Sequence, residues 1–265
     1  MADIWRGSTA LITGATRGIG AAFADQLARR GTNLVLVARD RNSLEKAAAD
    51  ARALGARADV IPADLSDPAA PAAIQRQVSQ LGITVDHLIN NAGIGVHGRF
   101  WDNPPEDHLK TIAVNVTAPT ALAARFLPGM LERRRGGILN VSSTAAFQGL
   151  AWLPVYSATK AYIVTWTEAL WVNLRGTGVR ACCLCPGGVD TPFFESNQWH
   201  QKPHSFLLQN TPAVARAGIR GYEADKSLKY SFFPFALAAW STRLVPRWLA
   251  ARAGSLYARP GKPPT

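Results

Sequence analysis

The stretch TALITGATRGIGAAFADQLARRG, residues 9–31, joins a short apolar run to an amphipathic one through three closely spaced glycines. TALIT predicts a buried strand, and the apolar residues that follow the glycines recur at helical spacing. Between the two elements, Gly14 permits a tight turn, Gly18 lets the backbone approach a phosphate, and Gly20 lets the helix pack closely on the strand. The free N–H groups at the start of the helix then face the phosphate. We therefore expect a dinucleotide-binding turn at the first strand–helix junction.

The alternation of apolar runs and helical patterns continues along the chain. LVLVA (34–38) precedes a helical pattern that Asn42 or Ser43 can cap, and further strands are expected at residues 58–64, 85–93, 136–143 and 179–185. Continuous apolar strands with intervening helices are typical of a parallel sheet covered on both faces. The sequence thus predicts the α/β class, with a Rossmann-like doubly wound parallel sheet in a single domain over residues 1–265.

Two segments interrupt this pattern. A substrate loop is expected at about residues 190–212, where the sequence is aromatic, polar and aperiodic, and a divergent segment occupies about residues 227–265. Within the second segment, SLKYSFF (227–233) is the best candidate for a last strand. We expect the segment to pack over the substrate cleft or over a partner subunit, because Pro234 and Pro246 break any long amphipathic helix. The alternative is a basic amphipathic segment that lies on a membrane.

The composition is that of an ordinary globular protein, with 265 residues, 48% of them apolar and 18% charged. The longest uncharged apolar stretch, residues 230–242, is too short to span a bilayer. Three clustered cysteines, Cys182, Cys183 and Cys185, fall in an expected buried strand and argue for a reducing compartment. Because the first residues carry no secretory signal, we expect the protein to be cytoplasmic.

The net charge of +11 makes nucleic acids and anionic membranes candidate partners. The cations are scattered apart from Arg133–Arg135, however, and no nucleic-acid-binding motif accompanies them. We expect no nucleic-acid partner, and we do not favour membrane contact. The histidines share no spacing, so no metal site is expected, although His200 and His204 stand one helical turn apart.

The stretch PVYSATKAYIVTW (154–166) carries a phenol and an ammonium on one helix face, because Tyr156 and Lys160 are four residues apart. A nearby ammonium lowers the pKa of a tyrosine from its usual value of about 10, which suits proton exchange with a carbonyl oxygen. Ser143 ends the run ILNVSS and is expected at the carboxyl edge of the sheet, where such folds bind ligands. Ser142 is its rival, because neighbouring strand residues face opposite ways.

The choice of dinucleotide depends on the residues that follow the second strand. An acidic residue there binds a ribose 2′-hydroxyl, whereas arginine accommodates a 2′-phosphate. In this chain Arg39 comes first and Asp40 follows, and Arg17 lies inside the glycine turn. Two guanidinium groups can form charge-assisted hydrogen bonds with a phosphate. We therefore expect NADP(H), with NAD(H) as the less favoured alternative.

Six motifs resemble, in their order and spacing, those of the short-chain dehydrogenase/reductase family: TGATRGIG (13–20), NNAG (90–93), Asn115, Ser143, YSATK (156–160) and PGGVDT (186–191). The resemblance covers about residues 8–192. It implies that Tyr156 is the catalytic acid/base and Lys160 its partner. It further implies that Ser143 anchors the substrate carbonyl and that Asn115 holds a water for proton relay. The implied cofactor site comprises Gly14, Thr16, Arg17, Gly18, Ile19, Gly20, Arg39, Asp64, Leu65, Asn91, Ala92, Gly93, Tyr156, Lys160, Pro186, Gly187, Val189 and Thr191.

The aromatic residues near these motifs favour a bulky apolar ketone, or the corresponding secondary alcohol, as substrate: Phe147, Trp152, Phe193, Phe194, Trp199 and Phe206. Residues 34–40 and 168–194 also resemble ketoacyl- and hydroxysteroid-type reductases. We predict an NADPH-dependent oxidoreductase that transfers a hydride between the nicotinamide and such a substrate. The alternatives are an NADP-binding sensor on the same fold, and a lipid-linked ketoacyl or steroid reductase at a membrane surface.

The helices expected at residues 105–131 and 156–175 are apolar around much of their circumference. Helices of this kind require cover on both sides. In the family that the sequence resembles, the matching helices form a two-fold dimer interface. We therefore expect a homodimer or a homotetramer.

Overall fold

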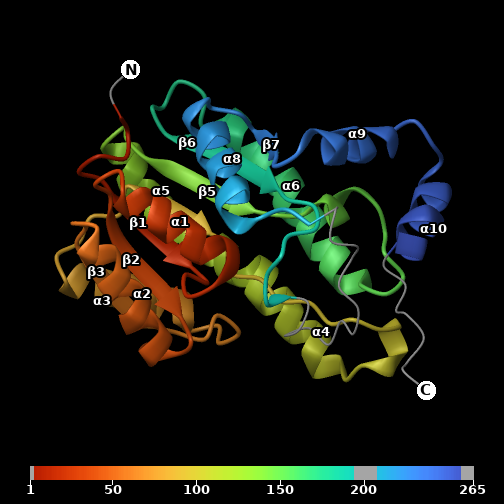
Figure 1. Ribbon diagram of the computed structural model, residues 1–265, viewed down its shortest axis with the longest axis horizontal. Helices are drawn as coiled ribbons and strands as arrows, with labels where there is room; N and C mark the ends of the chain where they lie inside the picture. Colours follow the sequence, from red (N-terminus) through yellow and green to blue (C-terminus); the bar gives the residue numbers. More distant parts are fainter. Residues whose placement is uncertain (1–2, 194–207, 258–265) are drawn as a thin grey trace.

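The computed structural model describes residues 3–193 and 208–257, and its strands form one seven-stranded parallel sheet (Figure 1). The strand order is β3-β2-β1-β4-β5-β6-β7. The chain therefore reverses its direction of winding between β3 and β4, and the two halves of the sheet meet at β1 and β4. At such a switch point the loops that follow neighbouring strands diverge and leave a crevice for a ligand. The doubly wound parallel sheet expected from the sequence is confirmed.

The strands lie within the expected apolar runs or one residue beyond them. The run SLKYSFF does supply the last strand, which pairs with β6 at the edge of the sheet. The strands are β1 (Thr9–Thr13), β2 (Asn33–Ala38), β3 (Ala58–Pro62), β4 (His87–Asn90), β5 (Gly137–Val141), β6 (Arg180–Cys185) and β7 (Leu228–Tyr230).

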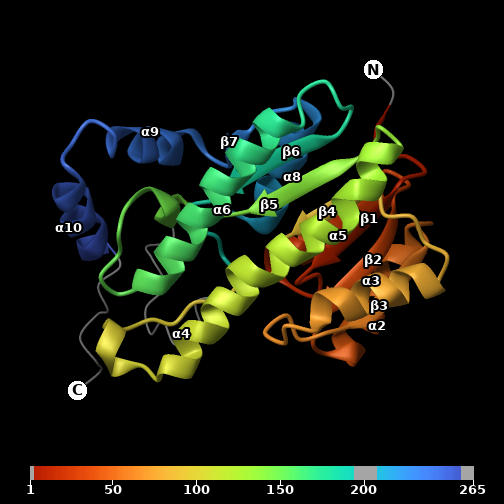
Figure 2. The ribbon, with the colours of Figure 1, turned by 180° about the vertical axis from the view of Figure 1, so that it is seen from behind.

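Helices cover both faces of the sheet (Figures 1 and 2). One face is covered by α1 (Gly18–Ala28), α2 (Arg41–Ala53) and α8 (Thr211–Glu223). The opposite face is covered by α3 (Ala70–Gln80), α5 (Ala118–Glu132) and α6 (Pro154–Asn173). Helix α4 (Pro105–Ile112) continues into α5 through a π-helical turn at Ala113–Thr117. Short 3₁₀ turns lie at Phe100–Asp102 and Thr144–Phe147.

The side chains of successive strand residues point alternately into the two cores on either face of the sheet. Ile12 and Leu36 pack under α1 and α2, whereas Leu11 and Val35 pack under α3 and α5. The same alternation separates the cysteines of β6, since Cys182 joins the first core and Cys183 faces α6. All three cysteines are buried free thiols in a strand, as the sequence predicts.

The cap of α2 differs from the expected one. Asn42 and Ser43 were the expected caps, but the carboxylate of Asp40 accepts a hydrogen bond from the backbone N–H of Ser43 at 2.6 Å. A carboxylate at the N-terminus of a helix also interacts favourably with the helix dipole. Asp40 is therefore engaged with α2.

Two further helices, α9 (Phe233–Ser241) and α10 (Arg247–Tyr257), stand away from the sheet at one end of the molecule (Figures 1 and 2). Helix α10 is held by the loop that precedes α6, where the backbone N–H of Ala151 donates to the Ser255 hydroxyl at 2.9 Å. Within residues 3–193 and 208–257, no helix is long and apolar enough to cross a membrane.

Candidate active site

The glycine turn after β1 has the backbone geometry that its sequence requires. Gly14 and Gly18 have φ angles of +65° and +59°, in the left-handed region that favours glycine. A side chain on Gly20 would collide with the carbonyl of Gly14, so this glycine brings α1 against the turn. The turn thus presents bare backbone and a helix N-terminus to the crevice, which suits a phosphate.

The loop after β4 locks onto this turn. The backbone N–H groups of Asn91 and Ala92 both donate to the Thr13 hydroxyl at 3.0 Å. The Asn91 side chain donates to the carbonyl oxygens of Thr13 and Gly14 at 2.9 and 3.2 Å. The two loops at the switch point of the sheet therefore form one rigid wall.

This wall borders a cavity of about 1120 Å³ at the carboxyl ends of the strands. Of the residues proposed from the sequence, all except Gly20 and Asn115 line it. They are Gly14, Thr16, Arg17, Gly18, Ile19, Arg39, Asp64, Leu65, Asn91, Ala92, Gly93, Ser143, Tyr156, Lys160, Pro186, Gly187, Val189 and Thr191.

Tyr156 and Lys160 occupy the middle of the cavity, on the first turns of α6. The Lys160 Nζ lies 5.6 Å from the centroid of the Tyr156 ring and donates to the carbonyl oxygen of Val141 at 3.0 Å. Two glycines make room for this pair. A Cβ atom on Gly93 would lie 3.1 Å from Lys160 Nζ, and one on Gly95 would lie 3.1 Å from the Tyr156 ring. Gly95 is not among the site residues predicted above, although the spacing Gly-Ile-Gly after a strand is a signal of close backbone approach.

The pKa values in the pair are set mainly by burial. Burial raises the pKa of the Tyr156 phenol to about 12, against the opposing effect of its hydrogen bond with Ser143. Burial also lowers the pKa of the Lys160 ammonium to about 8. The expected lowering of the Tyr156 pKa is therefore wrong for this structure, because desolvation of the phenol raises the pKa more than the Ser143 hydrogen bond lowers it. At neutral pH the tyrosine is a neutral acid and the lysine carries its charge.

The two serines at the end of β5 face opposite ways, as strand geometry requires. Ser142 is buried and its hydroxyl donates to the carbonyl oxygen of Lys160 at 2.7 Å. Ser143 caps the following 3₁₀ turn, accepting from the Ala145 N–H at 3.1 Å, and hydrogen-bonds Tyr156. Of the two rivals, Ser143 is therefore the one beside the phenol.

Asn115 lies in the π-helical turn behind Lys160. Its side chain accepts from the N–H of Ile94 at 2.9 Å, and it donates to the Ile94 carbonyl at 2.8 Å and to the Thr159 hydroxyl at 3.0 Å. A separate cavity of about 10 Å³ is bordered by Asn115, Lys160 and Asn90. This is about the size of one water, and the buried Asn90 Oδ1 has no hydrogen-bond partner among the described residues.

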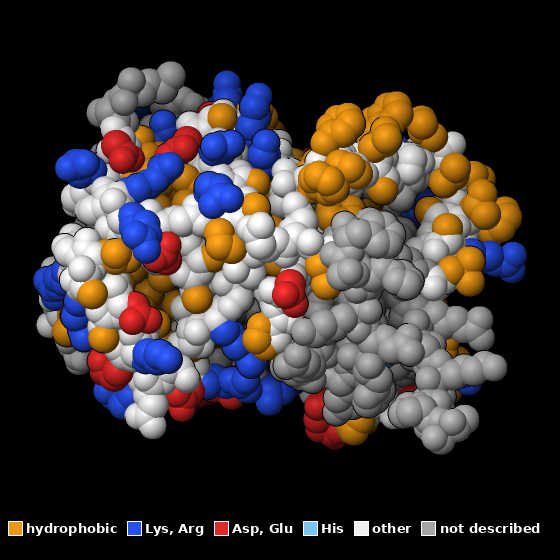
Figure 3. Space-filling view, viewed as in Figure 1, with side chains coloured by type: hydrophobic (Ala, Val, Ile, Leu, Met, Phe, Trp, Pro, Cys, Tyr) orange, Lys and Arg blue, Asp and Glu red, His pale blue; other side chains and the backbone are white. Residues whose placement is uncertain are grey.

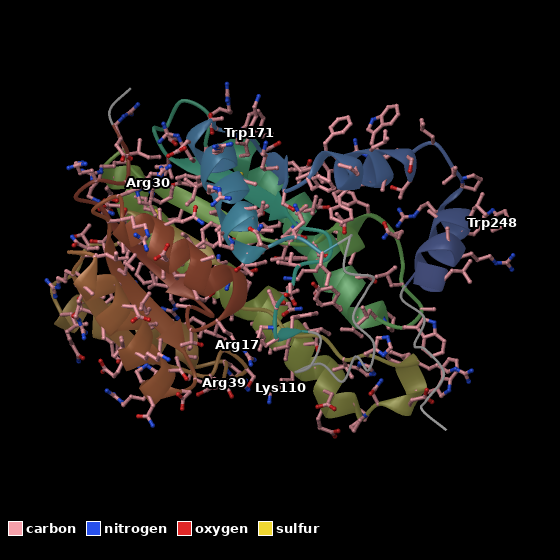
Figure 4. The ribbon with its side chains drawn as sticks, viewed as in Figure 1. Arg17, Arg30, Arg39, Lys110, Trp171 and Trp248 are labelled. Carbon is pink, nitrogen blue, oxygen red and sulfur yellow. The ribbon has the colours of Figure 1, made fainter. Side chains whose placement is uncertain are left out.

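Three cations lie at the end of the cavity beside β2, and the carboxylates of Asp40, Asp64 and Asp107 also line the cavity. Arg17, Arg39 and Lys110 come from three different elements and lie close together at this end (Figure 4). The charges of Lys110 and Arg39 help to lower the pKa of Asp64, after the larger effect of the Ser66 N–H. Lys110 is not predictable from its sequence context, because only the packing of α4 brings it to the end of β2.

The opposite end of the cavity is apolar and is closed by the C-terminal helices. The Phe193 ring lies 5.4 Å from the Tyr156 ring, and the Phe235 ring lies directly on Gly187. The remaining lining residues at this end include Leu150, Leu153, Ala238, Ala239, Thr242, Val245, Leu249, Ala250, Ala253 and Gly254. Helices α9 and α10 thus close the cleft, as was expected for this segment.

The other aromatic residues expected at the substrate are not all there. Phe147 packs against Tyr230 in the core beneath α6, with ring centroids 5.5 Å apart. Trp152 stacks on His97 at 6.4 Å and does not line the cavity. Phe194, Trp199, Phe206, His200 and His204 lie outside the described residues. The apolar lining therefore comes from α9 and α10 more than from the predicted aromatics.

An open parallel sheet, a glycine turn at its switch point, and a serine, tyrosine and lysine around one cavity define a nicotinamide-dependent oxidoreductase. The family model of the short chain dehydrogenases matches residues 8–202. The chain belongs to the short-chain dehydrogenase/reductase family.

Known relatives agree with this assignment. The chain is similar to the ketoacyl reductase HetN of Nostoc sp. strain PCC 7120, at 37% identity over 81% of this chain and 75% of the relative. It also resembles a short-chain dehydrogenase from Sphingobium yanoikuyae solved in complex with NADPH. That similarity has a TM-score of 0.81 and 29% identity, over 97% of this chain and 98% of the other. A bulky-bulky ketone specific alcohol dehydrogenase from Comamonas testosteroni has a TM-score of 0.74 and 29% identity, over 84% and 86% of the two chains.

Proposed function

We propose that the protein is an NADPH-dependent reductase that transfers a hydride between the nicotinamide and a bulky apolar ketone or its secondary alcohol. One observation carries the proposal. Tyr156, Lys160 and Ser143 line the same cavity as the glycine turn, between a basic end and an apolar end. The basic end suits a phosphorylated cofactor, the apolar end suits a substrate, and the three side chains lie where the two would meet.

The bare backbone of Gly14 and Gly18 and the N-terminus of α1 would hold the pyrophosphate, because a side chain at either glycine would contact the facing loop. The Lys160 ammonium has three N–H donors. One donates to the Val141 carbonyl oxygen, which leaves two for ribose hydroxyls. When bound, the cofactor supplies the hydride. All other chemistry falls to the protein.

Tyr156 is the proton donor to the substrate oxygen. With a pKa of about 12 it holds its proton at neutral pH, as reduction requires. Ser143 hydrogen-bonds the phenol and is placed to anchor the same oxygen. The positive charge of Lys160 stabilises the phenolate that remains after transfer.

Asn115 holds the Ile94 turn and, with Asn90 and Lys160, borders the small cavity that fits about one water. A water in this cavity would connect the lysine to the polar groups behind it. This arrangement supports the relay role that the family resemblance implies for Asn115.

The cations at the basic end favour NADP(H) over NAD(H). Arg17, Arg39 and Lys110 can surround a 2′-phosphate, whereas Asp40 is engaged in capping α2. This cap uses one oxygen of a carboxylate that also lines the cavity, so NAD(H) stays the less favoured alternative. The NADPH bound to the related Sphingobium yanoikuyae enzyme supports the same choice.

The apolar end favours a bulky substrate. Its lining by Phe193, Phe235 and the small residues of α9 and α10 offers few hydrogen-bond partners to a sugar. The ketoacyl and bulky-ketone activities named for two relatives support an apolar carbonyl compound. An acyl chain and a ring system both satisfy this description.

The test is the loss of NADPH absorbance with a panel of aliphatic, aromatic and polycyclic ketones. We expect turnover of bulky ketones, no turnover of sugars, and little activity with NADH. Tight binding of NADPH without turnover of any carbonyl compound would refute the reductase and leave a cofactor-binding sensor.

A further inference from the structure

Helices α9 and α10 each have two distinct faces. One face closes the substrate cavity through small or apolar residues such as Phe235, Ala239, Leu249 and Ala250. The other face points to solvent and is also apolar. We call this second face the outer face; it comprises Phe233, Leu237, Trp240, Leu244, Trp248 and Leu256, with Arg243, Arg247 and Arg252 beside them.

The spacing of the outer face follows the helix period. Phe233, Leu237 and Trp240 form one stripe on α9. Trp248 and Leu256 are 61% and 71% exposed and form a stripe on α10, with Arg252 between them. Figure 3 shows these hydrophobic side chains gathered over the two helices, and in Figure 4 Trp248 points away from the body of the protein.

An exposed apolar group of this size marks a surface that another body covers. Phe233 is 77% exposed, Leu244 is 67% exposed and Trp240 is 55% exposed. None of the three lines the substrate cavity. The substrate therefore does not account for the outer face.

The charge of this segment identifies the partner. After Asp225 the sequence contains no aspartate or glutamate, and it carries seven cations: Lys226, Lys229, Arg243, Arg247, Arg252, Arg259 and Lys262. None of the ion pairs among the described residues involves a residue beyond Asp225. The Arg252 guanidinium lies 5.4 Å from the Trp248 ring centroid, so it sits among the apolar side chains.

A second copy of the chain is a poor partner for this surface. Two copies meeting through their outer faces would bring cation against cation, with no acidic residue to pair them. Exposed tryptophan and leucine flanked by arginine match instead the boundary between lipid tails and anionic headgroups. The two short helices can lie in that boundary but cannot cross it.

We propose that the outer face of α9 and α10 docks on the surface of an anionic lipid bilayer. The sequence alone disfavoured this, because Pro234 and Pro246 break any long amphipathic helix and the sheet needs a further strand from the same segment. The two-faced helices both pack and bind a membrane, with the substrate cavity behind one face and lipid in front of the other. The proposal does not depend on the reductase activity, because binding to lipid requires no turnover.

The first test measures co-sedimentation of the full chain with vesicles of phosphatidylcholine, alone or mixed with phosphatidylserine. We expect binding to the mixed vesicles, weak binding to phosphatidylcholine alone, and release from the mixed vesicles at high salt. Equal binding to both vesicle types, or none to either, would overturn the proposal.

Paired variants separate the outer face from the net charge. Arg243→Gln with Arg247→Gln should weaken binding to the mixed vesicles roughly fivefold per arginine. The matched control, Arg76→Gln with Arg216→Gln, removes the same charge from exposed positions on α3 and α8 and should change binding little. Equal losses in the two double variants would show that only the overall charge matters, and the proposal would fail.

The apolar part is tested by Leu244→Ser with Trp248→Ser, against Leu81→Ser at an exposed position on the other side of the sheet. The double variant should lose vesicle binding, while its unfolding temperature and that of the control stay near the wild-type value. If the double variant keeps vesicle binding, the outer face is not inserted. If it instead converts a self-associated wild type to a smaller species, the occupant is a second copy.

Discussion

The ammonium nitrogen of Lys160 donates a hydrogen bond to the carbonyl oxygen of Val141, 3.0 Å away at the end of β5. This contact ties the lysine to the sheet backbone, with its nitrogen 5.6 Å from the centroid of the Tyr156 ring. The charge is therefore held near the phenol by a strand end and does not depend on a direct bond between the two side chains. The behaviour of the site follows from this arrangement.

Tyr156→Phe removes the transferable proton and keeps the ring that packs against Phe193. We expect ketone reduction to fall at least roughly a hundredfold, because general acid catalysis typically supplies that much, while NADPH affinity changes little. Steady-state rates and fluorescence titration of NADPH measure the two effects. Tyr162→Phe, on the exposed side of the same helix, is the matched control and should retain activity. If the Tyr156→Phe variant kept even a tenth of the wild-type rate, Tyr156 would not be the proton donor.

The pH dependence should differ between the two directions of the reaction. Reduction needs a protonated Tyr156, whose pKa is about 12, and a charged Lys160, whose pKa is about 8. The reduction rate should therefore be level near neutral pH and fall as the pH rises through about 8. Alcohol oxidation needs the phenolate and should increase with pH. Initial rates in both directions with saturating cofactor test this, and a reduction rate that stays level past pH 9 would contradict it.

Arg39→Ala should weaken the binding of NADPH much more than the binding of NADH. Loss of a charge-assisted hydrogen bond typically costs about 1.5–3 kcal/mol, or roughly ten- to a hundredfold in affinity. Lys110→Ala should shift the preference in the same direction, which the sequence alone did not predict. Lys46→Ala, an exposed lysine on α2, is the control. If the Arg39 variant lost affinity for NADPH and NADH equally, Arg39 would stabilise the fold and would not bind the 2′-phosphate.

Gly95→Ala should impair turnover more than cofactor binding. The added Cβ would lie 3.1 Å from the Tyr156 ring, so the ring must shift by a few tenths of an ångström. Small misplacements of a catalytic group can cost up to about a hundredfold in rate. We expect a lower kcat with an unchanged Kd for NADPH. Gly149→Ala is the control, because Gly149 also lacks a positive φ and its added Cβ would meet only the Ala251 Cβ, at 3.7 Å.

The solution mass should be that of a dimer or a tetramer. Leu109 and Val172 are 65% and 61% exposed on α4 and α6, the region in which the sequence predicts a subunit interface. Leu109→Glu with Val172→Glu should give a monomer in analytical ultracentrifugation. Leu244→Glu, on the outer face of the C-terminal helices, should leave the mass unchanged. A monomeric wild type at micromolar concentration would contradict the expected oligomer.

Most of the sheet could be predicted because the local sequence pattern is sufficient to indicate each strand. The runs TALIT and VRACCLC are apolar and bounded by turn residues, and both form strands within one residue of the expected position. The site residues that share a short motif were found for the same reason. The spacing of Tyr156 and Lys160 on one helix is sufficient to place both side chains on one side of the cavity.

The remaining features depend on contacts between distant segments. Lys110 is a surface lysine by its own sequence context, and only the packing of α4 brings it to the end of β2. The raised pKa of Tyr156 depends on how completely the surrounding loops exclude water, which residue spacing does not reveal. The capping role of Asp40 depends on the position where α2 begins, which the sequence placed at Asn42 or Ser43.

The contact between Phe235 and Gly187 has a consequence for how such an enzyme can diversify. The ring fills the space that any side chain at position 187 would need, so the helix that closes the substrate pocket rests directly on the loop after β6. Substitutions within α9 and α10 can remodel the pocket while the sheet, the tyrosine and the lysine stay untouched. A substitution at Gly187 would instead displace the Phe235 ring, which itself lines the pocket. Substrate range can therefore evolve in one short stretch of chain, provided that a single glycine beneath it is retained.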